Sequence, residues 1–137
     1  MTTARRRPTL VVARLRPREC GSAAVQLVVL MPALFMLMFA GMQAAMIYHG
    51  RTLAIAAAQE GARSAAAQNA GAGAGQDAAS AFVASAGGEG VLRGVSVSSS
   101  RAAAVVTVVV TGTTLSVVPG WTPRISQSAS APVEKLT

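Results

Sequence analysis

One long apolar run dominates the hydrophobic pattern at the start of the chain. From Ala23 to Tyr48 no residue is charged, and these roughly 26 residues would form about 39 Å of helix. A bilayer core needs about 20 apolar residues, whereas the apolar region of a cleavable secretory signal has about 7–15. A domain this small also has no core large enough to surround a helix that is apolar on every face. The pattern therefore predicts a transmembrane helix over residues 22–48.

The next segment keeps a helical composition but becomes amphipathic. Residues 51–70 are rich in Ala, Gln, Glu, Arg and Leu, which all favour helix. We expect the membrane helix to continue outside the bilayer over residues 49–70. Gln59, Glu60 and Arg63 fall on its polar side, where Glu60 and Arg63 are close enough for a weak ion pair. The expected apolar face is narrow and consists of Leu53, Ala56, Ala57 and Ala67.

The remainder of the chain changes from helical to alternating patterns. Residues 71–90 contain the Gly-rich stretch 71–76, predicted to be a linker, and then a short helix that Asp77 caps and Gly87-Gly88 ends. Residues 91–137 alternate Val with Ser and Thr, which predicts strands. A turn is expected at Pro119-Gly120, with Trp121 in it; Trp121 is expected to cover one edge of the sheet and to fill core rather than to stack on a ligand. The predicted fold is α+β, a long helix followed by a small antiparallel sheet of three or four strands.

The charge distribution predicts an orientation. The net charge is +7, and six arginines precede the apolar run while Arg51 alone follows it closely. Basic residues stay on the cytoplasmic side of a span, so residues 1–21 are expected to be a cytoplasmic leader and the carboxyl terminus extracytoplasmic. No aromatic or polar side chains are interleaved with the arginines to read bases, so nucleic acid is not an expected partner. The six are Arg5, Arg6, Arg7, Arg14, Arg16 and Arg18.

The candidates for catalysis are few. The chain has one cysteine, one histidine and four scattered carboxylates beyond the span, from which neither a catalytic triad nor a metal cluster can be assembled. We therefore expect no enzyme activity, no cofactor and no small-molecule substrate. Cys20 follows charged residues rather than an apolar stretch, which argues against a lipoprotein signal. His49 and Tyr48 are expected at the outer membrane interface.

Three sequence elements together resemble the TadE-like family of pilus assembly proteins. They are the Gly-Ser-Ala-Ala-Val start at residues 21–25, the early Leu-x-Pro of Leu30 and Pro32, and Gln59-Glu60-Gly61-Ala62-Arg63 beyond the span. The resemblance covers residues 18–67. It implies a type IV pilin-like fold and a minor pilin or pseudopilin of the tight-adherence (Flp) pilus.

The same resemblance implies a processing site and a set of partners. A prepilin peptidase would cut between Gly21 and Ser22, so that the mature helix begins at Ser22. Related proteins commonly carry glutamate at the fifth mature position; here it is Gln26, a polar packing position that supplies hydrogen bonds but no charge. The implied partners are the bilayer, other pilin-like subunits, the pilus assembly machinery and the peptidase.

The sequence thus predicts a non-enzymatic, single-pass membrane protein of a tight-adherence pilus or a related secretion and cell-adhesion system, located in the cell membrane or, once processed, in an extracellular pilus. Two alternatives stay open. In the first, the apolar run is a long secretory signal that is cut near Met46. In the second, it is the unprocessed anchor of a plain membrane scaffold protein.

Overall fold

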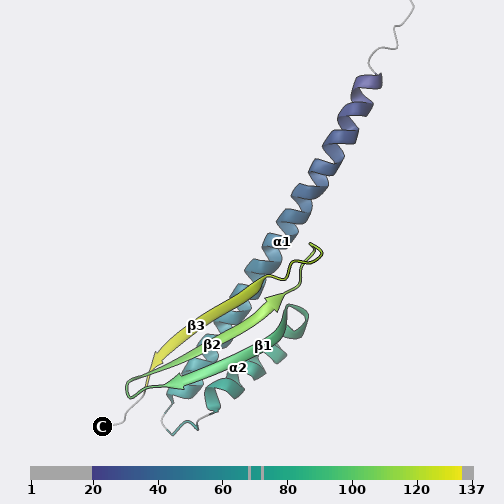
Figure 1. Ribbon diagram of the computed structural model, residues 1–137. Coiled ribbons are helices and arrows are strands. Elements are labelled where there is room, and N and C mark those ends of the chain that lie inside the picture. The colour runs from purple at the N-terminus through teal and green to yellow at the C-terminus, as the bar shows by residue number, and fades with distance from the viewer. Residues whose placement is uncertain (1–19, 68, 72, 134–137) are drawn as a thin grey trace, which may run out of the picture. The chain divides into compact units, whose positions relative to one another are not determined.

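The computed structural model describes residues 20–67, 69–71 and 73–133, and Figure 1 shows the elements that they form. The chain divides into two compact units, Met1–Met36 and Leu37–Thr137, and each is described by itself. Nearly all of the predicted leader, residues 1–21, lies outside the described residues, including the six arginines that set the expected orientation.

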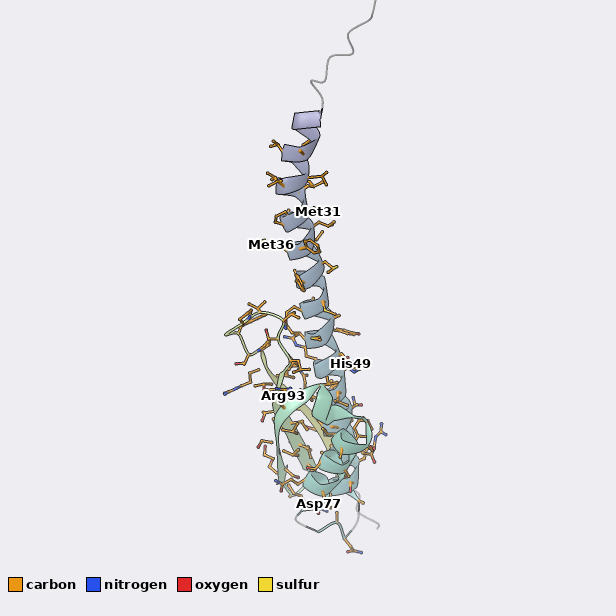
Figure 2. The ribbon with its side chains drawn as sticks, turned by 90° about the vertical axis from the view of Figure 1, so that its right-hand side faces the viewer. Met31, Met36, His49, Asp77 and Arg93 are labelled. Carbon is orange, nitrogen blue, oxygen red and sulfur yellow. The ribbon has the colours of Figure 1, made fainter. Side chains whose placement is uncertain are left out.

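The first unit contains the amino-terminal part of helix α1 (Cys20–Ala66). Its large apolar side chains are exposed on every side of the helix, and Figure 2 shows Met31 and Met36 among them. By length and composition α1 is able to cross a membrane. Pro32 lies inside the helix, which membrane helices tolerate. The exposed apolar residues of this unit are Val25, Leu27, Val28, Val29, Leu30, Met31, Leu34, Phe35 and Met36.

The second unit combines the rest of α1 with a second helix and a sheet. Helix α2 (Ala74–Ser85) and the short 3-10 helix η1 (Gly88–Gly90) precede the strands β1 (Leu92–Arg101), β2 (Val105–Thr114) and β3 (Arg124–Pro132). The sheet is antiparallel in the order β1-β2-β3, and the helices lie against one of its faces (Figure 1). The predicted α+β fold is confirmed: a long helix is followed by a small antiparallel sheet, which has three strands in the described residues where three or four were expected.

The strand β2 supplies the centre of the core. Val106, Val108 and Val110 are fully buried, and they alternate with half-buried residues on the other face of the sheet, such as Val109. Val109 lies opposite Ser98 on β1 and Ser128 on β3. One face of the sheet therefore packs on the helices while the other is rich in hydroxyl groups.

The helix α1 meets this core through small side chains. We call Ala54, Ala57, Ala58, Gly61, Ala62 and Ala65 the small-residue stripe; all six are buried, and they recur at the spacing of one helix face. The predicted apolar face was partly wrong. Leu53 and Ala57 are buried as expected, but Ala56 is only half-buried and Ala67 lies exposed beyond the end of the helix.

The helix α1 ends at Ala66, earlier than the predicted residue 70. The guanidinium of Arg101, at the end of β1, donates a 2.7 Å hydrogen bond to the carbonyl oxygen of Ala65. A cation at the carboxyl end of a helix binds free carbonyl groups and interacts favourably with the negative end of the helix dipole. Asn69 then adopts a left-handed conformation with φ 65°, so the chain turns away from the helical path.

The predicted 71–76 linker is shorter in the structure, because α2 already begins at Ala74 and its N-cap is Gly73. Asp77, predicted to be the cap, lies inside the first turn and makes no capping hydrogen bond. The helix begins early because Gly75 packs against α1, where an added Cβ would lie only 2.8 Å from Ala65 Cβ. The predicted end is confirmed: Gly87 follows the C-cap with φ 68°.

The two faces of β2 allow a matched test of the core. We expect Val108→Ala to lower the free energy of unfolding by about 2 kcal/mol, because it removes buried methyl groups and leaves a cavity. Val109→Ala, on the outer face of the same strand, should cost clearly less. Thermal unfolding of the full chain in detergent, followed by circular dichroism, measures both; equal losses would contradict the assigned faces.

Candidate functional site

The predicted Gln59–Arg63 motif divides between the inside and the outside of the domain. Gly61 and Ala62 are buried, whereas Gln59, Glu60 and Arg63 are exposed. The five residues cover more than one turn of α1, so some of them lie on its buried face and the others on its exposed face. The motif therefore combines a packing element with a polar surface.

Gly61 lies at a close approach of helices α1 and α2. A Cβ added at Gly61 would lie 2.5 Å from the carbonyl oxygen of Gly75, 3.0 Å from Ala79 Cβ and 3.1 Å from Val108 Cγ1. These contacts come from α2 and from β2, so Gly61 lies where α1, α2 and the sheet meet. A side chain here would collide with backbone, which cannot move aside as a flexible side chain can. The glycine of the motif is thus required by packing.

The charged residues of the motif form a surface pair. Arg63 Nη1 lies 4.0 Å from Glu60 Oε2, and the two side chains are 76% and 49% exposed. The predicted ion pair is present, but such pairs contribute little to stability. Glu60 and Arg63 are therefore available to a partner at small cost to the fold.

A second polar position, Gln43, was not singled out from the sequence. Its side chain is only 5% exposed and binds the chain after β2. Gln43 Oε1 accepts hydrogen bonds from Val117 N at 2.8 Å and Ser116 Oγ at 3.3 Å, and its Nε2 donates to the Leu115 carbonyl at 3.4 Å. The signal in the sequence was its isolation, since Gln43 is the one polar side chain between Gln26 and Tyr48.

These bonds hold the β2–β3 loop, residues 115–123, against α1. The predicted turn at Pro119-Gly120 is confirmed: Trp121 N donates to the Val118 carbonyl, and Gly120 has φ 78°, as a type II turn requires. Trp121 lies just after these turn residues, but the expectation that it fills core is wrong, because it is 49% exposed. The turn directs the ring outward, and valines fill the core instead.

The predicted processing site lies at the beginning of α1. Gly21 and Ser22 belong to its first turn, and Gln26 is exposed one turn further along. The described backbone is thus helical from the residue before Gly21 onward. The role of Gln26 in packing and the cut between Gly21 and Ser22 stay predictions.

Among the residues that the structure describes, no group of three or more His, Cys, Asp or Glu is placed to hold a metal ion. His49 is exposed on α1 near Tyr48, which is also exposed.

Comparison with known proteins supports the resemblance. The family model described as "TadE-like protein" matches residues 21–63. This segment is TadE-like. The predicted resemblance is thereby confirmed for residues 21–63. The TadE-like family is one of pilus assembly proteins, which in general are not enzymes. No curated protein and no solved structure matched the chain.

The TadE-like match lies entirely within α1. It begins at the predicted processing site and ends at Arg63, so it includes Gln43 and the packing glycine Gly61. The sheet and α2 lie beyond it. The matched segment is the part of the chain that carries both the apolar run and the contacts to the domain.

The packing role of Gly61 predicts opposite outcomes for two identical substitutions in α1. Gly61→Ala should lower the free energy of unfolding by about 1–3 kcal/mol, the usual cost of overpacking. Gly41→Ala is the matched control, since nothing lies within 4 Å of a Cβ added there; it should be neutral or stabilising, because alanine favours helix. Thermal unfolding in detergent compares them. A neutral Gly61→Ala would exclude the close contact.

The hydrogen bonds of Gln43 predict a local effect. Gln43→Leu leaves the Val117 N–H without its partner, so we expect a loss of about 1–3 kcal/mol and faster hydrogen exchange in residues 115–121. Gln59→Leu, which replaces an exposed glutamine of the same helix, is the control and should leave loop exchange unchanged. Mass-spectrometric hydrogen exchange on the full chain measures both. Unchanged protection in Gln43→Leu would show that other contacts hold the loop.

Proposed function

We propose that the chain is a single-pass TadE-like minor pilin or pseudopilin of a tight-adherence pilus, which works by helix packing and subunit assembly. The observation that carries the proposal is where the TadE-like match falls. It covers one helix whose amino-terminal part exposes apolar side chains and whose later part packs under a small sheet. A type IV pilin has this division between an assembling helix and a displayed domain.

The contacts of Gln43 argue against the secretory alternative. A signal cut near Met46 would remove Gln43 and its three hydrogen bonds to residues 115–117. The mature domain would then lose the attachment of its β2–β3 loop. Retention of the apolar run is therefore the more economical interpretation.

The charge pattern supports the orientation of this proposal. Six arginines precede the apolar run and Arg51 follows it, which favours a cytoplasmic amino terminus and an extracytoplasmic sheet. Processing after Gly21 would remove all six arginines. The remaining helix would begin with an apolar segment free to leave the bilayer for a bundle of pilin-like helices.

The exposed polar groups of α1 are suited to subunit contacts. Gln26 is exposed near the amino terminus of the mature helix, and Glu60 and Arg63 are exposed beyond Gly50. A buried polar group within a membrane or a helix bundle needs a partner. Gln26 would find one in a neighbouring subunit, by hydrogen bonding rather than by charge neutralisation.

The amino-terminal mass of the protein tests the proposal. Co-expressed with a prepilin peptidase, the chain should have a mature start at Ser22, and Gly21→Phe should accumulate at full length in the membrane, because a bulky side chain blocks the cut. Thr9→Phe, a bulky change within the leader, should be processed normally.

Any other amino terminus of the mature protein would support one of the alternative functions. A start near Met46 would indicate an exported protein with a long signal. Intact chain in the presence of active peptidase would indicate the unprocessed scaffold.

A further inference from the structure

One end of the second unit has an uncovered apolar tip. Val117, Val118 and Trp121 of the β2–β3 loop are 36%, 46% and 49% exposed, and the sequence has no charged residue between Arg101 and Arg124. A cluster of exposed large apolar side chains on a small domain indicates a contact surface.

The loop is fixed at a particular level of α1. Gln43 holds it through hydrogen bonds to Ser116 and Val117. In the turn that directly precedes Gln43, α1 exposes Phe39 and Met42. From Ala24 to Met42 the helix has about 19 residues, or roughly 28 Å, close to the roughly 30 Å of a hydrocarbon core. A span that ends at Met42, rather than at the predicted residue 48, would place Gln43 and its loop at the membrane surface, with Tyr48 and His49 outside the hydrocarbon core.

The backbone of the loop is suited to such an interface. The Val117 N–H is bound by Gln43, the Val118 N–H by Ser116 Oγ at 3.1 Å, and the Trp121 N–H by the Val118 carbonyl at 3.3 Å. Pro119 has no N–H to satisfy. The desolvation cost of bringing this loop next to lipid is thereby reduced.

Two arginines lie at the same end of the sheet. Thr113 pairs with Arg93 on β1 and with Arg124 on β3, so the three side chains share one face, and both arginines are exposed. They line a hollow of about 250 Å³ with Gly94 and Gly112. Figure 2 shows Arg93 near this end of the domain and Asp77 at the opposite end. A guanidinium pair beside backbone suits a phosphate group.

From this combination we propose that the β2–β3 loop, with Arg93 and Arg124, forms a lipid-binding surface. Val117, Val118 and Trp121 enter the interfacial region of the outer leaflet, and the two arginines bind anionic headgroup phosphates. Tryptophan is favoured at this depth because its ring is apolar and its N–H is polar. Met42, Met46 and Leu115 line an adjoining apolar hollow of about 360 Å³, which extends the surface toward the acyl chains. The inference rests on α1 spanning the bilayer, as in the proposed function.

The chain offers its own probe, because Trp121 is its only tryptophan. In the full chain reconstituted in phosphatidylcholine–phosphatidylglycerol vesicles, lipids brominated near the top of the acyl chain should quench Trp121 fluorescence, and aqueous acrylamide should quench it weakly. Quenching by acrylamide alone would overturn the proposal. Protection from both quenchers would also overturn it, because a second protein copy would then cover the loop.

The proposed binding of headgroup phosphates by Arg93 and Arg124 is tested by a separate measurement. Replacing phosphatidylcholine by phosphatidylglycerol should increase bromolipid quenching in the wild type, and the double variant Arg93→Gln/Arg124→Gln should lose that increase. Arg63→Gln, exposed on α1 away from this end, should retain it. Equal increases in all three proteins would refute the headgroup contact. Protein that floats with vesicles but shows no bromolipid quenching refutes the surface alone, whereas protein that does not float refutes the anchor as well.

Discussion

The contact between the small-residue stripe of α1 and the valine face of β2 is the interaction on which the domain depends. The core of the second unit consists mainly of alanine and valine, so it relies on close approach rather than on large side chains. Gly61 lets the backbone of α1 come near both Gly75 and Val108. Dispersion contacts decrease steeply with separation, so one added methyl group at this point would weaken contacts along the whole interface.

The same helix has to suit two environments. Its amino-terminal part exposes large apolar side chains, which water disfavours, and its later part buries alanine and glycine under a sheet. Gln43 lies where the change occurs. Its three hydrogen bonds to residues 115–117 are satisfied inside the domain, so a polar residue in an apolar run incurs no unpaired group. Gln43 thus fixes the β2–β3 loop at one level of α1.

Periodic features of the sequence were sufficient to predict the helices and strands, whereas tertiary contacts determine the helix boundaries and the exposure of single side chains. The long helix, the β strands and the Pro119-Gly120 turn follow from local patterns, and the structure has them. The predicted start of α2 was wrong, because the packing of Gly75 on Gly61 determines where this helix begins, and no local sequence signal reveals that contact. The exposure of Trp121 was also missed, since aromatic residues are usually core-forming in a chain with so few of them. Gly61 was recognised through the family motif, but its packing role required the contact with α2.

The small-residue stripe can pack against the sheet of its own chain or against a neighbouring helix, but not against both. Because Ala57, Ala58 and Gly61 are already buried, a partner helix has to contact α1 elsewhere. Two surfaces remain: the apolar segment before Gln43, and the side that exposes Glu60 and Arg63. Association within a membrane is driven by packing, whereas exposed charges mainly select partners and register. In the proposed assembly, the free energy of association would therefore come from the segment before Gln43, and the exposed pair Glu60 and Arg63 would select the neighbouring subunit.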